Sequence, residues 1–218
     1  MVNKKWMIST AVLGLIVLIL LIITVRQHNE NKYDDRYISE KLSNTVSGLS
    51  HAILENDKVL NDTLKDTKGK VVLTSLHAQM LCGNTHEIMN QMQELDHSAE
   101  LLGKRRQDGN LNNVAKFTLD AELYLSRKVM NNGLLYDCTA PKSDLTLNDE
   151  QKDFLQRLQT ANKEWARIVI KYIPGATNSE AWNSFWDKSR DGFVRRSWWV
   201  EMQKDFAASS GQLPLLPN

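Results

Sequence analysis

The segment from Trp6 to Val25 constrains this chain most, because it is an uncharged and mainly apolar run directly after Lys4 and Lys5. As an α-helix it would rise about 30 Å, which is the thickness of the hydrocarbon core of a bilayer. A cleaved signal peptide has an apolar core of only about 7–15 residues and a small-residue cleavage site. The residues after Ile22 offer no such site. The sequence therefore predicts an uncleaved transmembrane anchor over residues 6–25.

Charges beside the anchor predict its orientation. Lys4 and Lys5 stand on the short side, whereas the basic residues beyond the anchor are offset by Glu30, Asp34 and Asp35. Because positive residues collect on the cytoplasmic side, we expect a cytoplasmic N-terminus and a periplasmic or extracellular domain. The expected organisation is a short cytoplasmic tail, the anchor, a juxtamembrane linker, a helical bundle domain and an extended C-terminal tail, at residues 1–5, 6–25, 26–35, 36–208 and 209–218.

Apolar residues recur at helical spacing through most of the chain beyond the anchor. A first seam runs from Leu42 to Leu64, and a charged segment with a glycine at residues 65–70 separates it from a second seam that ends near Leu102. Two such seams predict a helical hairpin. Asn56 interrupts the first seam, and either it sets the register of packing or the helix turns its seam away from the core there. The second interpretation is preferred.

Two further helices are expected, at about residues 111–130 and 147–172. Asn131-Asn132-Gly133 would end the former, and Pro174-Gly175 the latter. No alternation long enough for a sheet is present. The sequence thus predicts an all-α protein, namely an N-terminal transmembrane helix followed by an antiparallel bundle of about four main helices and a short helical C-terminal region.

The C-terminal region is rich in aromatic residues, and two interpretations of it remain open. Its rings could cover one end of the bundle, as large aromatic side chains commonly do. Alternatively, part of the region could contact a membrane surface or a partner protein. The residues of that candidate surface are Phe193, Arg195, Arg196, Trp198 and Trp199. The core interpretation is preferred.

Cys82 and Cys138 are the only cysteines. A compartment outside the cytoplasm would permit a disulfide between them, but an even count alone leaves bridged and free states open. Cys82 also begins the best metal candidate, because Cys82, His86 and Met89 share one helix face and offer soft ligands. Three ligands on one straight helix span about 10 Å, too far for one ion. Packing is therefore the preferred role, and no metal or cofactor is predicted.

Enzyme signatures are incomplete. His86-Glu87 begins like a zinc-protease motif, but Asn90 stands where the second histidine belongs. Glu94 and His97 form a single Glu-x-x-His, whereas a di-iron bundle needs two. The formal net charge of +1 does not favour a nucleic-acid partner. We therefore expect neither an enzyme nor a nucleic-acid-binding protein.

These features predict a single-pass accessory or scaffold protein whose bundle binds another membrane or envelope protein, with homo-oligomers possible. The expected five-residue cytoplasmic tail leaves no room for a signalling domain. The alternative is therefore an extracytoplasmic sensor that binds a small ligand or a metal between its helices and signals through a partner subunit.

Overall fold

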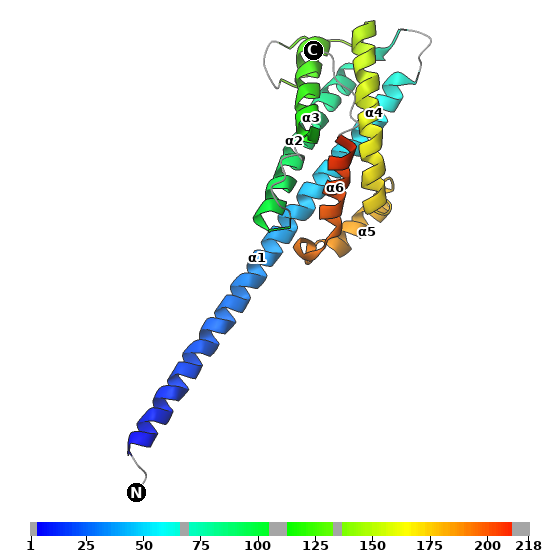
Figure 1. Cartoon of the computed structure of the whole chain (residues 1–218). Helices are drawn as coiled ribbons and strands as arrows, with labels where there is room; N and C mark the ends of the chain where they lie inside the picture. Colours follow the sequence, from blue (N-terminus) through cyan, green and yellow to red (C-terminus); the bar gives the residue numbers. More distant parts are fainter. Residues whose placement is uncertain (1–3, 66–69, 105–112, 133–136, 211–218) are drawn as a thin grey trace.

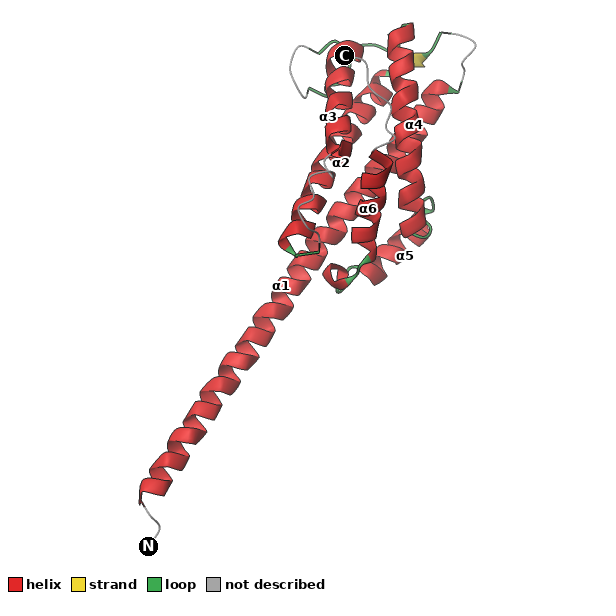
Figure 2. Ribbon diagram, viewed as in Figure 1, coloured by secondary structure: helices red, strands yellow, loops and turns green. Residues whose placement is uncertain are grey.

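The computed structural model describes residues 4–65, 70–104, 113–132 and 137–210, with the backbone alone at 4–16, 28–30 and 210. The described chain is mainly helical, which confirms the all-α prediction (Figure 2). The helices are α1 (Lys4–Leu64), α2 (Ser75–Leu101), α3 (Asn113–Tyr124), the π-helical turn η1 (Leu125–Val129), α4 (Asp149–Tyr172), α5 (Ser179–Ser189), the 3₁₀ turn η2 (Phe193–Arg195) and α6 (Trp198–Ser210). Two short strands, β1 (Val72–Leu73) and β2 (Leu145–Thr146), pair antiparallel.

Helix α1 is a single helix of 61 residues, which corresponds to a length of about 90 Å. Its N-terminal part projects away from the bundle, and its C-terminal part forms one wall of the bundle (Figure 1). Among the α1 residues whose side chains the structure describes, Ser39 is the first that is buried. Residues 26–35, expected as a linker, are helical and continuous with both neighbouring parts. The domain therefore has no break in secondary structure between the expected anchor and its core.

Among the described residues, we find no helix that is both long and apolar enough to cross a bilayer. The expected anchor includes residues 6–16, whose side chains lie outside the described part of the chain. Residues 1–3 and 211–218, which belong to the expected terminal tails, also lie outside it. The transmembrane anchor thus stays a prediction.

Helix α2 runs antiparallel to α1 and packs along it. Thr74 caps its start, because the Thr74 hydroxyl accepts from the His77 backbone N–H at 3.2 Å. Asn56, in the facing part of α1, is only 1% exposed. The helix therefore keeps its seam toward the core at Asn56, and the preferred interpretation of that residue was wrong.

Helix α4 supplies the third long wall and begins at Asp149, within two residues of the start that the sequence predicts. The Asn148 side chain accepts from the Gln151 backbone N–H at 2.8 Å, and the Gln151 side chain accepts from the Asn148 backbone N–H at 3.0 Å. This reciprocal capping satisfies two amide groups that the first turn leaves without helical partners. The helix ends at Tyr172, just before Pro174. Inside the bundle, the Asn162 amide donates to the Ile53 carbonyl of α1 at 2.9 Å.

Two short helices complete the bundle. Helix α3 packs on α2 in the half of the domain farther from the N-terminus, and α6 packs on α4 in the nearer half (Figure 1). Asn131, with a positive φ of 57°, follows the π-helical turn after α3, and such a backbone conformation stops a helix. The expected bundle of four main helices is thus built from three long helices and two half-length ones.

Most of the C-terminal aromatic rings enter the core. The large side chains that are fully buried there are Trp199, Phe193 and Phe206, and Trp186 is 5% exposed. Phe193 stacks on Trp186 with ring centroids 6.1 Å apart and meets Trp198 edge-on at 5.2 Å. Residues Trp182, Phe185 and Trp198 are partly buried against the same cluster. The aromatic region closes the end of the bundle from which α1 projects.

Candidate functional site

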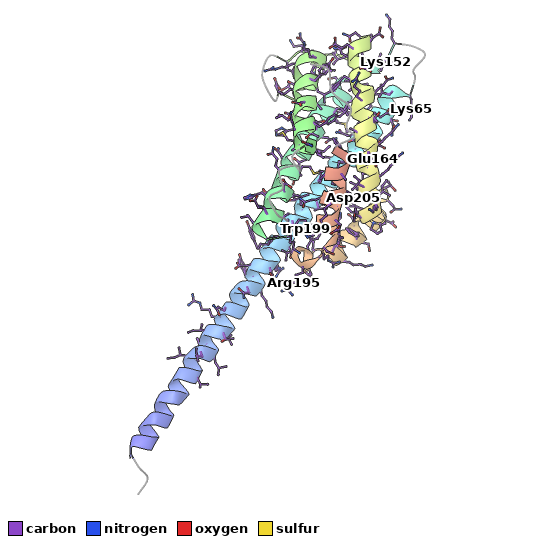
Figure 3. The ribbon with its side chains drawn as sticks, in the orientation of Figure 1. Lys65, Lys152, Glu164, Arg195, Trp199 and Asp205 are labelled. Atoms are coloured by element: carbon purple, nitrogen blue, oxygen red, sulfur yellow. A yellow bond between two sulfur atoms is a disulfide. The ribbon has the colours of Figure 1, made fainter. Side chains whose placement is uncertain are left out.

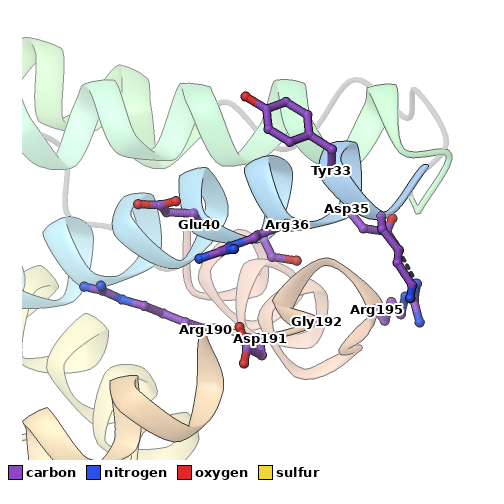
Figure 4. A pocket seen from close by; sticks show the side chains of 10 residues that line it. Tyr33, Asp35, Arg36, Glu40, Arg190, Asp191, Gly192 and Arg195 are labelled. Carbon is purple, nitrogen blue, oxygen red and sulfur yellow. Dashed lines mark hydrogen bonds and ion pairs between the residues drawn. The ribbon is translucent and has the colours of Figure 1, made fainter. Parts of the chain in front are cut away.

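A cleft of about 790 Å³ opens where α1 leaves the bundle, and we call it the basal cleft. One wall is α1, and the other is the segment that joins α5 to η2 (Figure 4). Figure 3 shows Arg195 at this end of the domain and Lys152 at the opposite end. The lining residues are Lys32, Tyr33, Asp35, Arg36, Ser39, Glu40, Arg190, Asp191, Gly192 and Arg195.

The two walls of the basal cleft are fixed to each other by polar contacts. The Ser39 hydroxyl, which is buried, accepts a hydrogen bond from the Val194 backbone N–H at 3.2 Å. Arg195 donates from Nη2 to the carboxylate of Asp35. Gly192 turns the second wall with a φ of 65°, a left-handed conformation that glycine adopts at no steric cost. The shape of the cleft is therefore set by contacts and a turn within the protein.

The basal cleft holds charges of both signs that are not paired with each other. Within the described part of the chain, Lys32, Arg36 and Arg190 make no ion pair, and neither do Glu40 and Asp191. By contrast, the fourth basic residue, Arg195, is paired with Asp35. The site thus presents three basic groups and two carboxylates to whatever enters it. Such groups can bind an acidic and a basic function on one molecule.

The structure separates the three metal candidates. Cys82 is joined to Cys138 in a disulfide, with Cα atoms 5.4 Å apart, so no thiolate is present to bind a metal. Met89 is 8% exposed and belongs to the hydrophobic core. No group of three or more His, Cys, Asp or Glu side chains within the described residues could hold a metal ion. Packing and a disulfide therefore account for Cys82 and Met89.

His86, the third candidate, instead faces a carboxylate that the sequence analysis missed. Its Nδ1 lies 3.1 Å from both carboxylate oxygens of Glu122 on α3. The Glu122 side chain is fully buried, whereas that of His86 is 42% exposed. A buried carboxylate is costly unless it is hydrogen-bonded or paired, so this contact compensates for the burial of Glu122. The pair links α2 to α3 one helical turn beyond Cys82.

The candidate partner surface is likewise divided. Phe193 and Trp199 are buried in the aromatic cluster, and Trp198 is partly buried against it. Arg195 and Arg196 are exposed, but Arg195 lines the basal cleft. The five residues therefore form no continuous exposed surface. The sequence did not predict the basal cleft, because its two walls lie more than 100 residues apart in the chain and no local motif connects them.

Comparison with known proteins gives no further assignment. No protein-family model, no curated protein and no solved structure matches this chain.

Proposed function

We propose that this is a single-pass membrane protein whose helical bundle lies outside the cytoplasm and binds another membrane or envelope protein. The continuity of α1 carries this proposal. One helix extends from the apolar segment into the core of the bundle. An anchor built this way would hold the bundle at a defined distance from the bilayer, which suits an accessory or scaffold role. No catalytic residues are proposed.

Exposed apolar side chains on α1 support the anchor. The large hydrophobic residues from Val17 to Val25 are between 47% and 60% exposed. Full burial of such a side chain is worth about 1.5–3 kcal/mol, so covering the exposed half would gain on the order of 1 kcal/mol for each. A bilayer would cover all of them at once.

The disulfide supports the expected location of the domain. Disulfides persist in oxidising compartments and are rare in the cytosol, where thiols are kept reduced. The bond between Cys82 and Cys138 therefore suits a periplasmic or extracellular bundle. This orientation agrees with the basic residues Lys4 and Lys5 on the other side of the apolar segment.

A partner would be met along α1 just beyond the anchor. Tyr33 and Tyr37 are 73% and 63% exposed, and their spacing of four residues places them on one face of the helix. Tyrosine is enriched in protein interfaces. We call this pair the stalk face. It suits a neighbouring membrane protein or a second copy of this chain.

Site-specific crosslinking tests the proposal. A photoreactive residue at position 37 in native membranes should capture a defined protein, and the same residue in place of exposed Lys163 on α4 serves as the control. Alkaline carbonate extraction should leave the chain in the membrane, and protease should reach the bundle only from the outside. Equal capture at both positions, or release by carbonate, would contradict the proposal.

One observation favours the alternative of a ligand-binding sensor that signals through a partner subunit. The basal cleft combines a substantial volume with unpaired charges. A ligand at 100 times its dissociation constant should stabilise the folded domain by about 2.7 kcal/mol. Ligand-dependent thermal stabilisation therefore distinguishes the sensor from a scaffold that binds protein alone.

A further inference from the structure

We infer that the basal cleft binds a small soluble zwitterion, a molecule that carries a carboxylate or phosphate together with a primary ammonium group. This inference deepens the sensor alternative by naming a ligand class. The soluble source of the ligand rests on the proposed anchor, but the chemistry of the cleft does not.

The unpaired charges select the ligand. Arg36 and Arg190 offer guanidinium groups, which match carboxylate and phosphate oxygens in geometry as well as charge. Glu40 and Asp191 offer acceptors for the three N–H donors of an ammonium group. A simple anion would face two carboxylates, and a simple cation would face three basic groups that include Lys32. A zwitterion gives both sets a partner.

The size of the basal cleft and the contacts between its walls fit a small molecule. Its volume of about 790 Å³ lies within the range of about 300–1,000 Å³ that is usual for ligand sites. Ser39 and Val194 join the walls by a hydrogen bond, and Asp35 and Arg195 join them by an ion pair. Because these contacts lie within the protein itself, binding need not order the second wall, which lowers the entropic cost of binding.

Distance from the bilayer decides between a lipid and a soluble ligand. Along α1, Lys32 lies about 10 Å beyond Val25, Arg36 about 16 Å and Glu40 about 22 Å. The polar layer on each side of the hydrocarbon core is only about 5–8 Å thick. If the hydrocarbon region ends at Val25, the basic residues and the carboxylates of the basal cleft both lie beyond the lipid head groups. The ligand would therefore come from solution.

The test uses the full-length protein in phosphatidylcholine nanodiscs and isothermal titration calorimetry. The probes are two zwitterions, each with its own two half-molecules: phosphoethanolamine with inorganic phosphate and ethanolamine, and β-alanine with propionate and ethylamine. At least one zwitterion should bind about tenfold or more tightly than either half, because hydrogen bonds to charged groups are the strong ones. Equal affinity for a whole molecule and its half, or no binding of any probe, would overturn the inference.

Variants show which residues bind the acidic end of the ligand and which bind its ammonium group. Arg190→Gln should weaken the zwitterion and phosphate about tenfold, since it removes one charge-assisted contact. Asp191→Asn should weaken the zwitterion by a similar factor and leave phosphate binding unchanged or stronger. Arg167→Gln is the matched control, because Arg167 is exposed on α4 and pairs with Glu164 outside the cleft. Circular dichroism checks that each variant keeps its helices.

Two outcomes separate this inference from the proposed function. If Arg190→Gln and Asp191→Asn bind the probes like the control variant, the cleft is not the site, whatever the membrane experiments show. If phosphatidylethanolamine in the nanodisc competes with phosphoethanolamine, the soluble source is refuted. Release of the chain by carbonate would refute the anchor, while a zwitterion response that depends on Arg190 and Asp191 would still establish the chemistry of the cleft.

Discussion

The disulfide between Cys82 and Cys138 encloses most of α2, all of α3 and the π-helical turn η1. A crosslink stabilises a fold mainly by restricting the unfolded chain, and the effect grows with the logarithm of loop length. The sequence separation is 56, for which the chain-entropy relation gives about 14 cal/mol/K, or about 4 kcal/mol at 25 °C. We therefore expect removal of this bond to cost a large share of the stability of the domain.

The perturbation is the double variant Cys82→Ala/Cys138→Ala. Alanine suits the middle of α2, because it has the highest helix propensity. Cys82 is fully buried, so loss of its sulfur adds a small packing cost of about 1 kcal/mol. The expected change in the free energy of unfolding is thus a decrease of about 4–5 kcal/mol. In a domain of this size, that corresponds to a fall of roughly 8–20 °C in Tm.

The assay is urea unfolding of the full-length protein in nanodiscs, followed by circular dichroism and tryptophan fluorescence. A thiol reductant should bring the wild-type protein to the midpoint of the double variant, apart from the packing cost, and should leave the variant unchanged. A decrease of less than about 1 kcal/mol, or an equal effect of the reductant on both proteins, would refute this reasoning. Coincident transitions by the two probes would show that the two-state treatment applies.

Three further predictions concern individual residues. Burial, followed by the hydrogen bond to Glu150, raises the pKa of Tyr124 from 10.0 to about 12. Because the folded state favours the neutral phenol, the contribution of Tyr124 to the free energy of unfolding is complete below pH 10. It should fall by about 2–3 kcal/mol as the pH rises to 12. Tyr124→Phe should flatten that loss in urea unfolding measured across this pH range, and an unchanged slope would contradict the assignment. His86→Leu should cost about 1–3 kcal/mol by leaving the Glu122 carboxylate without its imidazole partner, and His86→Leu/Glu122→Leu should recover stability in a double-mutant cycle; additive losses would show that the pair is not coupled. Gly192→Ala should cost about 1–2 kcal/mol through its positive φ alone, because the added Cβ would meet no heavy atom within 4 Å; a neutral thermal shift would exclude strain at this turn.

Local features of the sequence predicted the fold well where one segment determines the outcome. The end of α4 just before Pro174 depends on residues within one turn of the helix end, so it could be predicted directly. The burial of Asn56 could not be predicted in this way, because it depends on which face of α1 meets the other helices. The division of the fourth bundle position between α3 and α6 was missed for the same reason, since it arises from packing between segments far apart in the chain.

The candidate site was predictable only in its parts. The arginines near residue 195 stood out in the sequence, but only as members of a candidate membrane or partner surface, which was the less favoured of two interpretations. In the structure the rings turn inward, and a basic side chain from this segment pairs with Asp35 of α1. Sequence spacing identifies residues that share a helix face, whereas the basal cleft depends on two segments brought together by the aromatic core.

That aromatic core also determines what ligand binding could change. Arg36 and Glu40 belong to α1, while Arg190 and Asp191 belong to the segment after α5. One molecule bound by residues of both walls would therefore add a link between these walls. Helix α1 has no break between the basal cleft and the expected anchor. A shift of α1 against α5 would therefore be carried along the helix rather than absorbed at a hinge. The Tyr33 and Tyr37 stalk face lies on this same helix, which is where a partner that reads the bound state would have to make contact.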